Sequence, residues 1–135
     1  MEDRLQWDER YSVGVRSLDE DHRRLFESVN ALIDEIGQGS RGAAIHEALD
    51  LMLEDIVEHF DREEALMEKV GFPELPAHQG DHYLLLRTVL RFKTELKYDR
   101  LDAHSAARFL VDWVQEHLLK QDLKFKPYMP GQGDA

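Results

Sequence analysis

The amino-acid sequence predicts an all-α protein: an up-down-up-down four-helix bundle with an extended N-terminal arm. Apolar residues recur at helical spacing through four long segments, and glycine and proline gather at the few places between those segments. Short connections between long helices favour antiparallel neighbours. The 135 residues are the length of one ordinary domain. We therefore expect a single domain over 1–135, with an arm at 1–17, a bundle at about 18–125 and a tail at 126–135.

The first helix is expected over residues 18–36. Ser17 and Glu20 have the spacing of a capping box, in which each side chain bonds a backbone N–H at the helix start. The glycines that follow residue 36 break the helical pattern. The apolar stripe of this helix consists of Leu18, Leu25, Phe26, Val29, Leu32, Ile33 and Ile36.

Three further helices are expected over residues 43–70, over residues 77–97, and from Asp102 onward. The segment from Gly71 to Pro76 separates the second helix from the third, and Asp102 is a suitable N-cap for the fourth. Each apolar stripe covers one side of its helix, so the four helices can share one core. The stripes are Ile45, Leu49, Met52, Leu53, Ile56, Phe60, Leu66 and Met67; Leu85, Leu86, Val89, Phe92 and Leu96; and Ala106, Leu110, Trp113, Val114 and Leu118.

Residues 1–17 do not follow the helical pattern. Trp7 and Tyr11, followed by Val13 and Val15 on either side of Gly14, indicate an extended segment with apolar side chains. We expect this arm to lie along the bundle and to cover the ends of its helices.

Composition and charge exclude several classes of protein. The absence of cysteine excludes disulfides, zinc ribbons and cysteine-ligated iron–sulfur clusters. A net charge of −11 with no basic block argues against nucleic acid as a partner, and no apolar run approaches the roughly 20 residues of a membrane span. The N-terminal residues lack the basic start and apolar stretch of a signal peptide. We expect a cytoplasmic protein that does not insert into membranes.

Five of the seven histidines fall on the inward faces of the predicted helices. Four of them lie three or four residues from members of an apolar stripe, and His78 lies four residues before His82, which continues into Leu85. This spacing places all five on the apolar faces of their helices. Every helix therefore points at least one possible metal ligand at the core. The inward-facing set is His22, His59, Glu63, His78, His82 and His117.

A metal centre explains why so many polar groups face the core. Burying them is unfavourable unless something satisfies them. The set exceeds the four ligands of a tetrahedral zinc site. With a second carboxylate it suits two ions of five or six coordination, because carboxylates can bridge. Neutral imidazole suits zinc, copper, iron and nickel, but iron best matches mixed imidazole and carboxylate ligation with open positions. We therefore predict a di-iron centre.

The candidate for the second carboxylate is Asp122, five residues after His117. On an ideal α-helix five residues rotate about 500°, so these two side chains diverge by roughly 140°. A π-type turn or a loosened helix end would bring them together. From spacing alone, Asp122 is either a ligand or a solvated acid. The two remaining histidines, His46 and His104, have no partner at ligand spacing and are expected to be solvated.

In their order and spacing these motifs resemble the hemerythrin family, whose single-domain bacterial members are called bacteriohemerythrins. The resemblance covers roughly residues 7–128. Its motifs are the Trp7 arm with Val13-Gly14-Val15, Asp19-Glu20-Asp21-His22, His59-Phe60 through Glu63-Glu64 to Met67, His78 through His82, and Trp113 through His117 to Asp122.

The resemblance implies two unequally ligated irons. His78, His82 and His117 would bind one iron, and His22 and His59 would bind the other. Glu63 and Asp122 would bridge the irons, with a solvent-derived oxo or hydroxo group between them. The iron with two histidines would keep an open position, where O2 would bind as a ligand. The positions that resemble the family's pocket wall are Leu25, Phe60, Trp113, Val114 and Leu118.

The predicted function is reversible O2 binding, as an oxygen carrier, store or sensor, without enzymatic activity. An alternative is a di-iron enzyme with peroxidase, oxidase or nitric oxide scavenging activity. Carboxylate-rich di-iron bundles place Glu-x-x-His motifs on two helices. This chain instead has His59-x-x-x-Glu63 and His78-x-x-x-His82, which points away from that group. A third possibility is a module that reports iron or O2 to a partner bound in trans. A bundle covered by its own arm needs no second subunit, so we expect a monomer.

Overall fold

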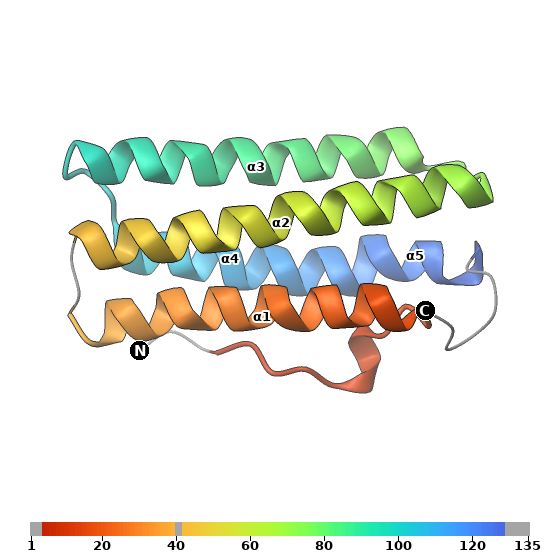
Figure 1. Cartoon of the computed structure of the whole chain (residues 1–135), viewed down its shortest axis with the longest axis horizontal. Helices are drawn as coiled ribbons and strands as arrows, with labels where there is room; N and C mark the ends of the chain where they lie inside the picture. Colours follow the sequence, from red (N-terminus) through yellow and green to blue (C-terminus); the bar gives the residue numbers. More distant parts are fainter. Residues whose placement is uncertain (1–3, 40–41, 129–135) are drawn as a thin grey trace.

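The fold is a bundle of long helices packed side by side. The computed structural model describes residues 4–39 and 42–128. Neighbouring helices run antiparallel along the long axis (Figure 1), with α1 packed on α2 and α4, and α2 packed on α3. The predicted all-α, up-down-up-down bundle is confirmed. In chain order the elements are η1 (Glu9–Tyr11), α1 (Arg16–Gly37), α2 (Gly42–Val70), α3 (Leu75–Lys97), α4 (Ala103–Glu116), the π-helical η2 (His117–Asp122), α5 (Leu123–Phe125) and η3 (Lys126–Tyr128).

The helix ends lie within two residues of the predicted ones, and their local chemistry explains them. Helix α2 ends at Val70, because the next residue, Gly71, has a left-handed φ of 72°. The Phe72 N–H donates to the Met67 carbonyl oxygen at 2.9 Å. Helix α3 begins earlier than expected and includes Pro76 in its first turn, where a missing N–H costs no helical bond. Asp102 is the N-cap of α4, as predicted, and accepts from the Ser105 N–H at 3.1 Å.

The capping box predicted at the start of α1 is wrong. The helix begins one residue before Ser17, its N-cap is Val15, and no side chain caps it. Asp19 instead accepts a bond from the Val13 N–H at 2.9 Å and one from the Ser12 hydroxyl at 2.6 Å. Val13 and Val15 are both buried. Burial of Val13 and Val15 therefore sets where α1 starts. Asp19, in the first turn of α1, binds the arm through Ser12 and Val13.

The arm lies antiparallel to α1 (Figure 1). Near its start, Leu5 exchanges two hydrogen bonds with the Asn30 side chain, at 2.8 Å and 2.9 Å. Further along, the rings of Trp7 and Tyr11 pack against Phe26, with centroids 5.7 Å and 5.0 Å away. The arm thus lies along the bundle, as the sequence predicts, although it also contains the short 3₁₀ turn η1.

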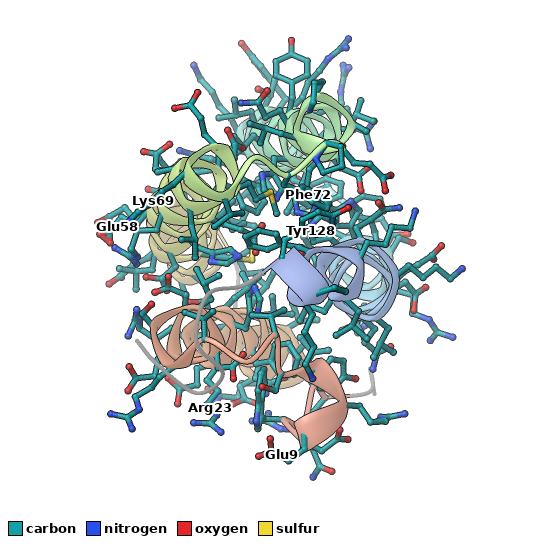
Figure 2. All side chains as sticks on the ribbon, turned by 90° about the vertical axis from the view of Figure 1, so that its right-hand side faces the viewer. Glu9, Arg23, Glu58, Lys69, Phe72 and Tyr128 are labelled. Atoms are coloured by element: carbon teal, nitrogen blue, oxygen red, sulfur yellow. The ribbon has the colours of Figure 1, made fainter. Side chains whose placement is uncertain are left out.

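Two apolar clusters fill the bundle. The larger contains Leu25, Phe60, Leu85 and Leu118 together with most of the predicted stripes. The smaller lies at the end of the bundle that faces the viewer in Figure 2, where Phe72 and Tyr128 meet with ring centroids 5.2 Å apart. It consists of Val13, Val15, Leu18, Met67, Phe72 and Phe125. Along α1, α2 and η2–α5, the buried residues between the two clusters are polar, and they belong to the site described next.

A helix that spans a bilayer needs about 20 predominantly apolar residues. Among the described residues, none of the helices is long and apolar enough to cross a membrane.

Candidate metal centre

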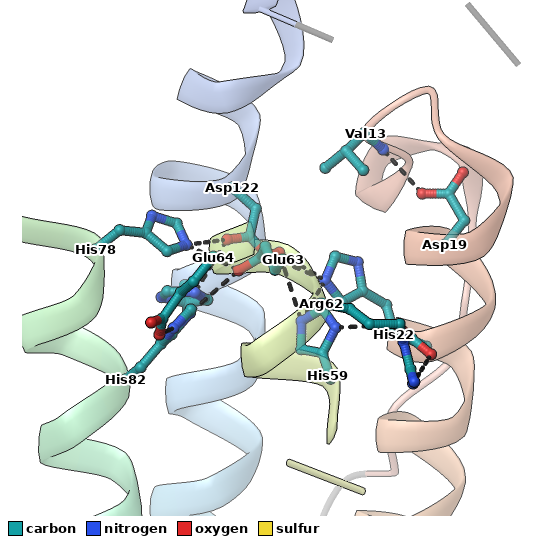
Figure 3. A network of polar contacts seen from close by, with 12 residues as sticks. Val13, Asp19, His22, His59, Arg62, Glu63, Glu64, His78, His82 and Asp122 are labelled. Atoms are coloured by element: carbon teal, nitrogen blue, oxygen red, sulfur yellow. Dashed lines mark hydrogen bonds and ion pairs between the residues drawn. The ribbon is translucent and has the colours of Figure 1, made fainter. Parts of the chain in front are cut away.

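Seven ionisable side chains from four parts of the bundle converge between the two apolar clusters (Figure 3). On α1 the convergent residue lies between Leu18 and Leu25. On α2 one of the two lies between Phe60 and Met67, and the other immediately precedes Phe60. Each of the seven is buried, none exposing more than 4% of its surface. They are His22, His59, Glu63, His78, His82, His117 and Asp122, the seven candidates from the sequence.

The π-helical segment η2 explains how Asp122 joins the group. It begins at His117 and ends at Asp122. A wider turn brings residues five apart onto one face, whereas an α-helix would turn them away from each other. The Asp122 Oδ1 accordingly lies 3.0 Å from the His117 Nε2. Of the two alternatives that spacing left open, the buried position is the observed one.

Glu63 directs its two carboxylate oxygens at two different groups of histidines. Its Oε1 lies 3.0 Å from the Nε2 of His78 and 3.1 Å from that of His82. Its Oε2 lies 3.4 Å from the Nε2 of both His22 and His59. One carboxylate therefore spans the space between a pair of histidines on α1 and α2 and a pair on α3.

Asp122 repeats this arrangement from the opposite side of the bundle. Its Oδ1 lies 2.8 Å from the His78 Nε2, in addition to the His117 contact. Its Oδ2 lies 3.1 Å from the His22 Nε2. The side chains thus divide into a three-histidine group, His78, His82 and His117, and a two-histidine group, His22 and His59, with both carboxylates between the groups.

The nitrogen and oxygen atoms of the seven side chains are better satisfied by metal ions than by hydrogen bonds among themselves. Each of two sets offers four ligand atoms within 4.8 Å of one another, and the sets share Glu63. Several of these buried atoms have no hydrogen-bond partner, among them the Glu63 Oε2, both Asp122 carboxylate oxygens and the Nε2 atoms of His82 and His117. Buried polar atoms are rarely left unpaired. Cations at the centres of the two sets would satisfy all of them.

The carboxylates also require positive charge. Burial raises the pKa of Glu63, but the imidazoles of His59 and His22 lower it further, to well below its ordinary value. Burial and Glu63 raise the pKa of Asp122, yet His117 and His22 outweigh them, so its pKa is lowered too. Two carboxylates therefore stay ionised in the interior, which is tolerable only beside cations.

Without a metal, protons on three histidines provide that charge. Burial lowers the pKa of each, but Asp122 and Glu63 outweigh burial and raise the pKa of His22 to about 9 and that of His78 to about 10. The pKa of His117 rises to about 9, again against burial and chiefly because of Asp122. Burial dominates at His59, whose pKa is lowered. Metal ions would replace these protons.

The sequence prediction missed three acids that lie just outside the convergent group. Glu64 accepts from the His82 Nδ1 at 2.6 Å, and Asp81 accepts from the His117 Nδ1 at 3.2 Å. Asp21 lies 3.6 Å from the His59 Nδ1. Each acid is next in sequence to a convergent residue, yet it contacts a histidine on the following helix. The adjacency is visible in the sequence, but the cross-helix contact is not.

Of the two histidines left out of the group, both are exposed. The prediction that His46 has no partner at ligand spacing is wrong, because its Nδ1 lies 3.2 Å from Asp50, one helical turn later. This pair is at the surface, with 47% of the His46 side chain exposed, and does not touch the buried group.

The five residues predicted to form a pocket wall belong to the larger apolar cluster or pack against it. Leu25, Phe60, Val114 and Leu118 are buried in the larger cluster, and Trp113 packs against it half-buried. Phe60 stacks on His82 with centroids 3.6 Å apart, and Trp113 stacks on His117 at 4.3 Å.

Known proteins resemble this chain in sequence over most of its length. Residues 13–129 match the family profile of the hemerythrin HHE cation binding domain. A bacteriohemerythrin of Methylococcus capsulatus is 28% identical over 118 residues, which cover 87% of this chain and 89% of that protein. A hemerythrin-like protein of Naegleria gruberi is 31% identical over 122 residues, which cover 90% of this chain and 91% of that protein.

A solved structure shares the fold as well. The crystal structure of wild-type hemerythrin aligns with a TM-score of 0.84 and 27% identity over 91% of this chain and 95% of its own. The match to the family profile includes all seven convergent residues. On sequence, fold and the composition of its buried polar group, this chain belongs to the hemerythrin family.

Proposed function

We propose that this chain holds two iron ions in a non-haem, carboxylate-bridged centre and binds O2 there reversibly. The observation that carries the proposal is the orientation of Glu63 and Asp122. Each carboxylate directs one oxygen to the three-histidine group and the other to the two-histidine group. This is the arrangement that bridging between two ions requires, and mixed imidazole and carboxylate donors suit iron.

The proposed ligands are unequal in number at the two positions. His78, His82 and His117 would bind one iron, His22 and His59 the other, and a solvent-derived oxo or hydroxo bridge would complete the centre. The two-histidine position has one protein ligand fewer, so O2 would bind there. When bound, a ferrous pair supplies the two electrons that O2 accepts on binding.

The surroundings of the centre favour binding and release of O2 over its cleavage. Leu25, Val114 and Leu118 are buried and would exclude water from the proposed pocket, which hinders escape of reduced oxygen species. Among the described residues, Asp21 is the one buried acid outside the seven, and it is occupied by Arg24 and Arg62. With no spare proton donor there, we propose an oxygen carrier, store or sensor instead of a peroxidase, oxidase or nitric oxide scavenger.

An oxygen titration tests the proposal. We expect purified protein to contain two irons per chain by elemental analysis. After anaerobic reduction it should take up one O2 per iron pair, with a change in visible absorption, and return it under vacuum. Irreversible oxidation on the first addition of O2 would favour the enzymatic alternative, and a single bound zinc would overturn the metal assignment.

A further inference from the structure

The acids outside the centre form cross-helix pairs with its histidines. Glu64 on α2 accepts from His82 on α3, and Asp81 on α3 accepts from His117 at the start of η2. Both bonds are made to Nδ1, on the opposite side of the ring from the Nε2 atom that faces Glu63 or Asp122. A carboxylate at Nδ1 keeps the proton on that nitrogen and leaves Nε2 free as a donor.

One of these two acids is also held by a second neighbour. Glu64 accepts a bond from the Gln79 side-chain amide at 3.2 Å, so its carboxylate is fixed from α3 as well. Its side chain is 26% exposed, and that of Asp81 is 37% exposed. Among the described residues, neither acid forms an ion pair with an arginine or lysine, so each pairs with its histidine alone.

The two-histidine group lacks such support. Among the described residues, neither the buried Nδ1 of His22 nor that of His59 has a hydrogen-bond partner. Asp21 is 3.6 Å from His59, but it is engaged by Arg62 through two bonds of 2.8 Å and 2.7 Å. Its charge is therefore largely compensated by an arginine. The two groups therefore differ in the acids that contact their histidines as well as in the number of histidines.

We propose that Glu64 and Asp81 are positioning residues for the three-histidine group. They fix the tautomer and orientation of His82 and His117, so that this group binds its metal ion more tightly than the two-histidine group does. The inference rests on the proposed two-ion centre and adds to it residues outside the ligand set. The ring orientation of His82 then follows from Glu64 and Gln79, and that of His117 follows from Asp81 and the stacked Trp113. Such outer carboxylates raise the basicity of a ligating imidazole.

Stepwise binding of Co²⁺ to the metal-free protein tests the proposal without any O2 chemistry. The wild-type chain should bind two ions, one in a tighter step and one in a weaker step. Visible absorption and competition with a chelator measure both steps. Glu64→Ala and Asp81→Ala should each weaken the tighter step by about 10- to 100-fold and leave the weaker step unchanged. Glu64→Gln, which keeps an acceptor but loses the charge, should fall between wild type and Glu64→Ala.

The matched controls are acids on the same surfaces that do not touch the buried histidines. Asp61→Asn removes an exposed acid beside Glu64. Glu116→Gln removes an exposed acid beside Asp81, one that accepts a bond from Lys120 at 3.3 Å. Both should bind Co²⁺ as wild type does. In the Zn²⁺-loaded protein, the NMR signal of the His82 Nδ1 proton should lose its downfield shift in Glu64→Ala and recover it in Glu64→Asp, an effect that a purely structural role would not produce.

The outcomes separate the inference from the function on which it rests. A wild-type chain that binds fewer than two ions would overturn the two-ion centre itself. A wild-type chain that binds two ions, with variants at Glu64 and Asp81 that bind as tightly as the controls, would overturn the positioning role alone. Weakening of only the weaker step would overturn it as well.

Discussion

Single residues decide the chemistry of this protein through the direction in which their atoms point. Glu63 and Asp122 are ordinary acids in the sequence, but each spans the gap between two groups of histidines. Five histidines aim their Nε2 atoms at these oxygens. The same residue types at the surface do nothing comparable: His46 and Asp50 form a simple pair one turn apart.

That contrast gives a test at the residue scale. His59→Ala removes one of two histidines from its group, so we expect the iron content to fall from two ions per chain to about one, because the remaining ligands hold an ion weakly. His46→Ala, the control, should leave the iron content at two. Elemental analysis of protein purified in parallel decides the matter, and equal losses in both variants would contradict the assignment of inward and outward faces.

At the scale of elements, the π-helical η2 is the departure from regular structure that completes the site. A regular α-helix through Asp122 would point it away from His117. The wider turn also lets the chain continue into α5, where Phe125 enters the smaller apolar cluster. One irregular segment therefore serves both the polar layer and the packing of the bundle end.

The start of the preceding helix provides a prediction at this scale. Asp102→Ala removes the acceptor of the Ser105 N–H, and loss of an N-cap costs about 1 kcal/mol of unfolding free energy. Urea unfolding should show a lower midpoint with an unchanged slope. Asp112→Ala, which alters an exposed acid within α4, should change the free energy by less than about 0.5 kcal/mol. A result as large as that for Asp102 would mean that the cap is not the cause.

At the scale of the whole molecule, a charged layer lies between two apolar clusters, and this makes stability depend on what occupies the layer. In the metal-free protein the folded-state pKa values of His22, His78 and His117 lie above the ordinary value of 6.5. Their protons stabilise the fold fully below about pH 6.5, and this stabilisation is lost as the pH rises through about 9 to 10. Glu63 and Asp122, with lowered pKa values, stabilise the fold above their ordinary range and cease to do so in acid.

The expected result is a urea midpoint of the metal-free protein that falls between about pH 6.5 and about pH 10, since the native state binds more protons than the unfolded state there. His22→Gln should make this fall shallower by removing one of the three protonated groups. The iron-loaded protein should not show the fall, because metals bind the deprotonated imidazoles and bind them better as the pH rises. A midpoint that rises with pH in the metal-free protein would contradict the charge balance described here.

The sequence by itself determined the bundle, its antiparallel order and six of the seven convergent side chains, because helical periodicity assigns each residue to a face. Tertiary structure decided the rest. Asp122 joins the group only through a π-helical turn, whose stability depends on packing at the bundle end. Glu64 and Asp81 act across helix boundaries, and periodicity within one helix carries no information about the next. The first residue of α1 was likewise set by burial of the arm's valines, which outweighs a local capping motif.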